Sequence, residues 1–264
     1  MSTTISDAEL AEAYWRSFVA MWRTDRHRED AQGAFAIVDD GVFLRIYSHL
    51  PQFWQHQALL VNETLAEHEY DPLVVGLVAD FHGRSAPLGL AVGPSGERVA
   101  DNVLTRHGFR RHTLGLVMGR ELDRADISGN LVPPGLVVHP TSEYIELAVA
   151  RAIIGEVFDS PLLIRNYLVD DLPYIPYIAE LNGVAVAAAT LISCDEVAGI
   201  YSVATLPQYR GHGYATAMVD KMVADAATMG FRTAVLGCVP AMVRHYARSG
   251  FRVAGTPIGY LLEP

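Results

Sequence analysis

A short glycine-rich segment offers the clearest chemistry in this sequence. Arg210, Gly211 and Gly213 lie in "PQYRGHGYAT", between the apolar run "GIYSVATL" and a region where apolar residues recur at helical spacing from Tyr214 onward. A helix N-terminus has unpaired N–H groups and a partial positive charge, so it stabilises an anion placed there. Glycines let the backbone approach that anion closely, and an arginine adds further donors. The segment therefore predicts a binding site for a phosphate or pyrophosphate group.

Two common nucleotide-binding motifs do not match this segment. A Walker loop requires Gly-Lys-Ser/Thr, which the segment lacks. A Rossmann fingerprint requires a small residue three places after the second glycine and an acidic residue at a later strand end. Here Ala215 comes two places after Gly213, and Asp225 lies within the predicted helix. The alternative is an ordinary strand-to-helix turn with incidental glycines.

The sequence resembles the GNAT superfamily of N-acetyltransferases at this loop and at a second segment. Arg210, Gly213 and Ala215 match the family's Arg-x-x-Gly-x-Gly/Ala loop, which binds the pyrophosphate of acyl-CoA. "VPAMVRHYARSGF" matches its Tyr-x-x-x-Gly-Phe segment, with Tyr246 as the tyrosine. The resemblance covers about residues 136–264 and implies an α/β fold with a mixed, mostly antiparallel sheet flanked by helices.

The same resemblance implies how acetyl-CoA, as co-substrate, is bound without a metal. Main-chain groups of Val203, Ala204 and Thr205 would pair with the pantetheine arm, and the N–H of Val203 would polarise the thioester carbonyl. For His212 two interpretations stay open, a phosphate contact or a position that many residue types can fill. The implied pyrophosphate site consists of Arg210, Gly211, His212, Gly213, Tyr214, Ala215 and Thr216.

The resemblance also makes Tyr246 the general acid that protonates the departing thiolate. A tyrosine can do so only if it is well positioned, because its ordinary pKa of about 10 exceeds the roughly 8.5 of a thiol. The alternative is a core tyrosine on a short helix. Cys238 has two interpretations, an acyl-accepting nucleophile or a small buried residue, and the absence of a nearby His or Lys pattern favours the second.

No general base can be assigned from the sequence. Many relatives carry a glutamate on the fourth strand, but "AGIYSVATL" contains no carboxylate or histidine. Asp195, Glu196 and the pair Asp170-Asp171 are possible substitutes, and charged residues in loops are usually solvated. His245, beside Tyr246, is expected to point elsewhere on its helix.

The elements that position these residues follow from apolar spacing. A capping-box pattern at Ser6 and Glu9 starts a helix that runs to about Arg23. Asn182 and Gly183 predict a tight hairpin. "HTLGLVMGREL" and "GTPIGYLL" each read as a single strand. A helix over "SEYIELAVARAIIGEVF" is expected to bury a stripe made of Ile145, Val149, Ala152 and Ile153.

Two halves of the chain resemble each other. "RHGFR" at 106–110 and "RSGFR" at 248–252 lie 142 residues apart, each between a short helix and a strand, which predicts an internal duplication. We expect a degenerate GNAT-like domain over 1–125, a linker over 126–140 and a catalytic domain over 141–264. The first half lacks the glycine loop, and the 142-residue offset places Leu104 at the position equivalent to Tyr246. We therefore expect the first half to cover the acceptor side of the catalytic domain and to shape its substrate pocket. Four aromatic residues of this half could line that pocket or belong to the core: Trp15, Trp22, Phe53 and Trp54.

Composition and net charge limit the classes of partner that we expect for this protein. The net charge of −10 disfavours a nucleic acid and suits a cationic small molecule. The N-terminus lacks a signal-peptide pattern, and the apolar run "VAVAAATLISC" is too short to span a bilayer, so we expect a cytoplasmic protein, monomer or homodimer, without a membrane partner. The predicted function is acetyl-CoA-dependent N-acetylation of a small-molecule amine by direct attack in a ternary complex. The alternatives are a protein or peptide N-acetyltransferase and a non-catalytic acyl-CoA sensor.

Overall fold

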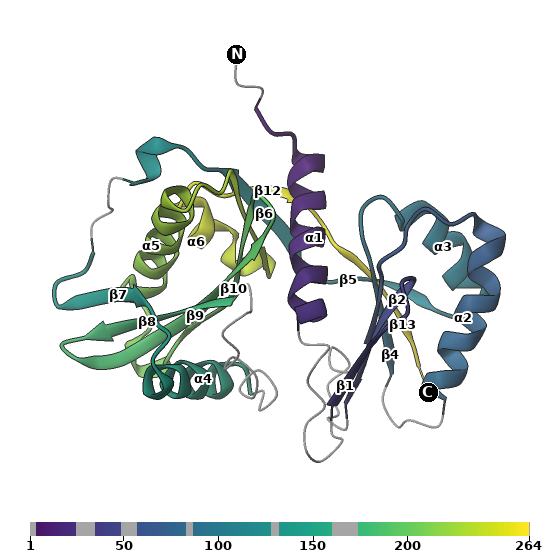
Figure 1. Cartoon of the computed structure of the whole chain (residues 1–264), viewed down its shortest axis with the longest axis horizontal. Helices are drawn as coiled ribbons and strands as arrows, with labels where there is room; N and C mark the ends of the chain where they lie inside the picture. The colour runs from purple at the N-terminus through teal and green to yellow at the C-terminus, as the bar shows by residue number, and fades with distance from the viewer. Residues whose placement is uncertain are drawn as a thin grey trace. The chain divides into compact units, whose positions relative to one another are not determined.

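The chain forms two compact units that exchange segments. The computed structural model describes residues 4–24, 35–48, 57–82, 87–127, 132–159 and 174–263. Unit 1 comprises Met1–Ser17 and Val117–Ala254, and unit 2 comprises Phe18–Leu116 and Gly255–Pro264 (Figure 1). No helix among the described residues is long and apolar enough to cross a membrane.

Unit 1 is built on a seven-stranded mixed sheet with the order β12-β6-β11-β10-β9-β8-β7. Helices α4 and α5 lie on opposite faces of this sheet (Figure 1). The strands are β6 (Leu116–Glu121), β7 (Leu136–Pro140), β8 (Tyr174–Leu181), β9 (Val184–Cys194), β10 (Val197–Thr205), β11 (Thr233–Cys238) and β12 (Arg252–Gly255). The helices are α1 (Asp7–Thr24, its first part in this unit), α4 (Tyr144–Phe158), α5 (Tyr214–Thr228) and α6 (Val243–Ala247).

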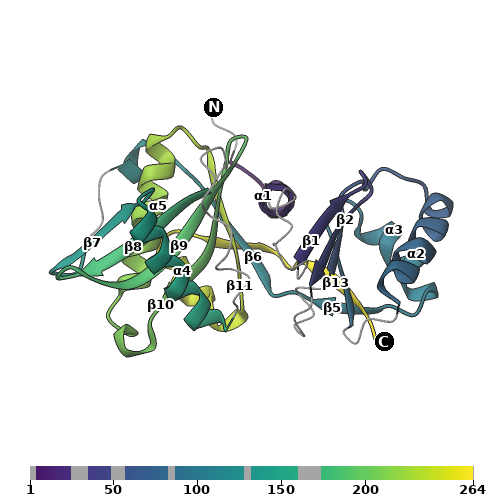
Figure 2. The same cartoon turned by 60° about the horizontal axis from the view of Figure 1, so that its bottom comes forward.

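Unit 2 is built on a six-stranded mixed sheet with the order β1-β2-β3-β4-β13-β5. Both of its long helices pack on one face (Figure 2). The strands are β1 (Phe35–Asp39), β2 (Phe43–Ser48), β3 (Gln57–Leu60), β4 (Leu88–Val92), β5 (Arg110–Thr113) and β13 (Ile258–Leu262), and the helices are α2 (Glu67–Phe81) and α3 (Glu97–Arg106). The two mixed sheets with flanking helices confirm the predicted fold class.

The exchange of two strands corrects the expected domain boundaries. "HTLGLVMGREL" is not one strand, because β5 belongs to the sheet of unit 2 and β6 to the sheet of unit 1. The end of the chain passes in the other direction, because β12 belongs to the sheet of unit 1 and β13 to the sheet of unit 2. The boundaries 1–125 and 141–264 therefore do not follow the units, and β7 lies inside the expected linker of 126–140. Apolar periodicity identifies a strand but does not say which sheet takes it.

The two units share local geometry that fits the predicted internal duplication. Each sheet contains a parallel pair, β3–β4 in unit 2 and β10–β11 in unit 1, which is joined through a helix and has the exchanged strand beside it. Helix α3 closes with the N–H of Phe109 on the carbonyl of Leu104 at 3.1 Å, and α6 with Phe251 on Tyr246 at 3.2 Å. Gly108 and Gly250 carry the left-handed φ, +85° and +80°, that each closure requires.

Two local predictions have opposite outcomes. The hairpin at Asn182 and Gly183 is confirmed, since both residues have positive φ and Leu181 pairs with Val184. The buried stripe predicted for α4 is wrong, because Ile145 is 77% exposed. The helix is apolar on most positions, so spacing alone does not identify its buried face. The face that packs consists of Leu147, Ala150, Ile153 and Ile154.

Helix α1 approaches β10 so closely that only glycine fits at residue 199. A Cβ built on Gly199 would lie 2.1 Å from the Ser17 Oγ and 2.5 Å from the Tyr201 Cε2. Ser17 is fully buried, and its Oγ lies 3.1 Å from the Tyr201 hydroxyl. Leu10 and Ala13 of α1 share a buried cluster with Val197 and Val235.

We therefore predict that Gly199→Ala destabilises the protein by about 1–3 kcal/mol, because the added methyl must displace α1 or Tyr201. Urea unfolding measures this change. Gly76→Ala is the matched control: Gly76 lies within α2 and a Cβ there would meet nothing within 4 Å. That control should be neutral or stabilising by up to about 1 kcal/mol. A Gly199→Ala protein as stable as the wild type would contradict the close packing of α1.

We also predict that deletion of residues 256–264 unfolds unit 2 before unit 1. The deletion removes β13 from between β4 and β5, together with the buried Ile258 and Tyr260. It leaves the edges of β4 and β5 without partners. Limited proteolysis with mass spectrometry should then show early cleavage within 18–116. Early cleavage within 174–254 instead would argue against the exchange.

Candidate functional site

The glycine loop has the geometry of an anion-binding turn. A short 3₁₀ helix, Pro207–Tyr209, follows β10, and the Arg210 Nε donates to the carbonyl of Thr205 at 3.0 Å. Gly211 and Gly213 have φ of +84° and +82°, and a Cβ on either would meet nothing within 4 Å. Glycine is thus required for backbone conformation, and the space beside the loop is open.

The loop leads directly into the N-terminus of α5. Gly213 is the residue before the helix and provides no side-chain cap. The N–H of Ala217 makes a helical bond to the carbonyl of Gly213 at 3.0 Å. The preceding amides of Tyr214, Ala215 and Thr216 have no helical acceptor, so they suit an external anion. His212 is exposed and its ring stacks on Tyr214 with centroids 5.7 Å apart.

Strand β10 contains a bulge near its end. Tyr201 pairs with Thr190 and Ala204 with Ala188, so Ser202 and Val203 together face the single residue Ala189. Ser202 has a φ of +54°, which is uncommon for a residue other than glycine. A bulge interrupts the ladder and redirects the local backbone. The N–H of Val203 is consequently placed in an irregular part of the strand.

Strands β10 and β11 pair over only part of their length. The parallel pairing joins Val197–Gly199 to Thr233–Val235 and then stops, although β10 continues to Thr205 and β11 to Cys238. Main-chain groups on the facing edges beyond these pairs no longer bond to each other. An extended ligand can therefore pair with the β10 edge as an added strand would. This opening and the loop lie at the same end of β10.

Tyr246, on α6, is buried at 8% exposure and packs edge-to-face on Phe251. Burial raises the pKa of its hydroxyl to about 12, and the nearby Cys238 thiol adds to the rise. The phenol therefore keeps its proton at neutral pH and can donate it. The burial of Tyr246 agrees with the interpretation as a core tyrosine, and its role as a general acid stays a prediction.

Other candidate groups are less suited to chemistry. Burial raises the pKa of the Cys238 thiol, which keeps it protonated and favours its interpretation as a small buried residue. Burial, together with the charge of Arg248, lowers the pKa of His245. Asp195 is exposed, and its carboxylate lies 3.9 Å from the guanidinium of Arg16. Glu196 lies 3.4 Å from Arg232.

Asp195 and Glu196 also lie at the wrong end of the strand. They precede β10, whereas Val203 lies near its end, seven to eight residues away, which at roughly 3.3 Å per residue is a separation of roughly 23–26 Å. Direct proton transfer from the amine to either carboxylate is excluded at that separation. The other suggested carboxylates, Asp170 and Asp171, lie outside the described residues, as do Phe53 and Trp54. Trp15 is buried.

One group near the opening was not predicted from the sequence. Tyr14 of α1 lies against Gly237 of β11, and its ring lies 6.3 Å from that of Tyr201. The predicted capping box at Ser6 and Glu9 locates α1 correctly, since the Ser6 hydroxyl bonds to Glu9 at 2.7 Å. A residue pattern on a helix does not reveal which distant strand it will cover.

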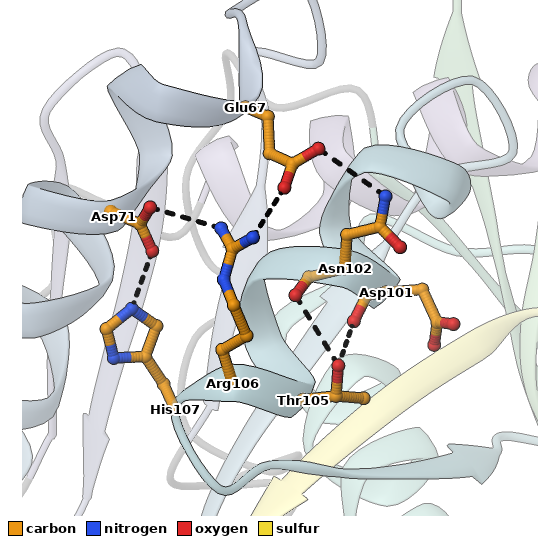
Figure 3. Close-up of polar contacts among 7 residues, drawn as sticks. All are labelled: Glu67, Asp71, Asp101, Asn102, Thr105, Arg106 and His107. Carbon is orange, nitrogen blue, oxygen red and sulfur yellow. Dashed lines mark hydrogen bonds and ion pairs between the residues drawn. The ribbon is translucent and has the colours of Figure 1, made fainter.

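The equivalent helix of unit 2 has the opposite electrostatics. Helix α2 begins after "VNETLA" with Glu67, Glu69 and Asp71, and the Ala66 amide is capped by the Glu69 carboxylate at 2.7 Å. The carboxylates of Glu67 and Asp71 on α2 point toward the guanidinium of Arg106, which belongs to α3, with N–O distances of 2.6 and 3.1 Å (Figure 3). Its N-terminus is thus already occupied by carboxylates and would repel a phosphate. Leu104, which occupies the position equivalent to Tyr246 in this unit, is buried.

Among the described ranges, no group of three or more His, Cys, Asp or Glu side chains could hold a metal ion. No curated protein matches the sequence. Solved structures do match, including a GCN5-related N-acetyltransferase from Kribbella flavida, with a TM-score of 0.67 and 16% identity over 93% of this chain and 95% of that one. A GCN5-related N-acetyltransferase from Sphaerobacter thermophilus gives 0.63 and 16% identity over 100% and 95%.

These likenesses extend over nearly the full length of both chains, so the fold with both sheets is shared. Residues 144–251 match the family model described as Acetyltransferase (GNAT) family, and this range contains the loop, β10, β11 and Tyr246. Residues 144–251 are therefore a GNAT acetyltransferase domain, and the chain as a whole shares the fold of these two GCN5-related N-acetyltransferases.

Proposed function

We propose that unit 1 is an acetyl-CoA-dependent N-acetyltransferase that acts on the amine of a small molecule. The observation that carries this proposal is the combination of the open glycine loop with the parted strands β10 and β11. The loop suits a pyrophosphate, and the parted strands suit an extended arm ending in a thioester. The net charge of −10 favours a cationic acceptor.

In this proposal the cofactor-binding residues have distinct roles. The amides from Gly211 to Thr216 bind the pyrophosphate, with Arg210 beside them. The Arg210 Nε is engaged with Thr205, which holds the side chain at the loop while its terminal nitrogens remain for the anion. The main chain of Val203, Ala204 and Thr205 pairs with the pantetheine arm.

Acetyl-CoA supplies the acetyl group as a thioester when bound. The N–H of Val203 donates a hydrogen bond to the thioester oxygen, which stabilises the negative charge that develops during attack. Tyr246 gives its proton to the sulfur as the carbon–sulfur bond breaks and the carbon–nitrogen bond forms. The amine loses its proton to solvent, and Tyr246 regains one. Because the pKa of Tyr246 is raised, transfer must accompany bond cleavage.

We infer that unit 2 binds no acetyl-CoA. Its equivalent helix begins with carboxylates in place of a glycine loop. One molecule of acetyl-CoA per chain is the consequence, with unit 2 in a structural or acceptor-side role.

We predict that Gly213→Asp weakens acetyl-CoA binding at least about 100-fold, because the carboxylate would occupy the anion position. Isothermal titration should give one site in the wild type and little binding in the variant. Gly213→Asn is the matched control, because asparagine has the same shape and accepts the left-handed conformation without a charge. It should bind more tightly than Gly213→Asp. Absence of binding by folded wild-type protein would refute the proposed function.

We predict that Tyr246→Phe lowers kcat for acetyl transfer about 100-fold or more and leaves the Kd for acetyl-CoA almost unchanged. Thiol release and titration measure the two quantities. The raised pKa has a second consequence, since the phenol remains protonated up to about pH 12. The pH profile should therefore rise as the amine deprotonates and show no descending limb below pH 10. A fall in activity between pH 8 and 10 that Tyr246→Phe abolishes would contradict this.

A further inference from the structure

We propose that Tyr14 of helix α1 is an acceptor-binding residue, whose hydroxyl receives a hydrogen bond from the acceptor amine at the opening between β10 and β11. This inference rests on the proposed function and deepens it. It assigns a specificity role to a residue that precedes the GNAT domain of 144–251 by well over 100 positions.

The position of the hydroxyl carries the proposal. A Cβ built on Gly237 would lie 2.6 Å from the Tyr14 Oη and 3.1 Å from its Cζ, so the phenol rests directly on β11. Gly237 is exposed and lies beyond Val235, where the pairing with β10 has ended. The Tyr14 hydroxyl therefore lies at the edge of the opening and not above the paired part of the sheet.

Helix α1 is held firmly in this position. Leu10 and Ala13 pack on Val197 and Val235, the first and last residues of the paired segments on the two strands. One turn further, Ser17 meets Gly199 and hydrogen-bonds to the Tyr201 hydroxyl at 3.1 Å. Contacts on both sides of Tyr14 thus fix the register of the helix over β10 and β11.

The reacting groups lie close by. Tyr246 packs in the apolar cluster of Leu236, and Tyr14 packs in the cluster of Val235 and against Gly237. Because successive residues of β11 face opposite sides of the sheet, the two tyrosines approach this end of the strand from its two faces. Tyr201 precedes Val203 by two residues on β10, just before the bulge. Tyr14, Val203 and Tyr246 would therefore surround a thioester in the opening, each from a different element.

The chemistry of the group is suited to an amine. Burial raises the pKa of Tyr14 and of Tyr201, so both phenols are uncharged at neutral pH. A neutral phenol oxygen accepts a hydrogen bond from an amine N–H and leaves the nitrogen lone pair directed elsewhere, toward the carbonyl carbon. The aromatic rings of Tyr14 and Tyr201 add an apolar surface. A primary monoamine on an apolar body matches these features.

The test uses the full chain with phenethylamine and glycinamide as acceptors, followed by thiol release at saturating acetyl-CoA. Tyr14→Phe should raise KM for the accepted amine about tenfold, the effect of one hydrogen bond, and leave the Kd for acetyl-CoA unchanged. Tyr144→Phe is the matched control, because Tyr144 is exposed on α4. A merely structural role for Tyr14 would lower the melting temperature without this selective change in KM.

Gly237→Ala tests the same hydroxyl without removing it. The added methyl would displace the Tyr14 Oη, so KM should rise as in Tyr14→Phe. The double variant should show no further rise, because both changes act on one group. Additive effects in this cycle would overturn the proposal.

The outcomes separate the two proposals. If the wild type binds acetyl-CoA but releases thiol with neither amine, the proposed small-molecule acetyltransferase is refuted and this inference with it. If the wild type is active and Tyr14→Phe leaves KM unchanged, the role of Tyr14 alone is refuted.

Discussion

The limited pairing of β10 with β11 is the constraint on which the rest of unit 1 depends. Three residue pairs hold the strands together, and beyond them the two facing edges do not pair with each other. A sheet usually satisfies such edges within itself, because unpaired main-chain groups are costly. The elements around the opening hold the two strands in this arrangement. The bulge at Ser202 and Val203 bends β10, α1 covers the paired part, and Tyr246 of α6 shares an apolar cluster with Leu236 of β11.

The two units differ mainly at the N-terminus of the helix that connects their parallel strands. Both have a parallel strand pair connected through a helix of the same length, and α3 and α6 end with the same hydrogen bond. In unit 1 the connecting helix begins after a bare glycine turn, so its amides face an open space. In unit 2 the same helix begins with acidic residues paired to Arg106 and His107. Electrostatics at one helix terminus, more than the fold, distinguishes the units.

The sequence predicts local features better than long-range ones. The loop, the Asn182–Gly183 hairpin and the start of α5 follow from residue types that permit few conformations, glycine above all. The exchange of β6 and β13 could not be predicted, because alternation identifies a strand and not its neighbours. The bulge in β10 was likewise hidden, since Ser202 is not a residue that favours positive φ. The contact of Tyr14 with Gly237 depends on tertiary packing alone.

The exchange also means that the segment matched by the family model does not contain its whole sheet. A fragment beginning at residue 141 would contain the loop, β10, β11 and Tyr246, but it would lack β6, which lies between β11 and β12. It would also lack α1, leaving Val197 and Val235 without Leu10 and Ala13. Two further hydrogen bonds link this fragment to the rest of the chain. Arg120 donates to the carbonyl of Ser249, and Arg252 donates to the carboxylate of Asp7. The family segment supplies the chemical groups, and residues from the other half of the sequence complete the sheet that positions them.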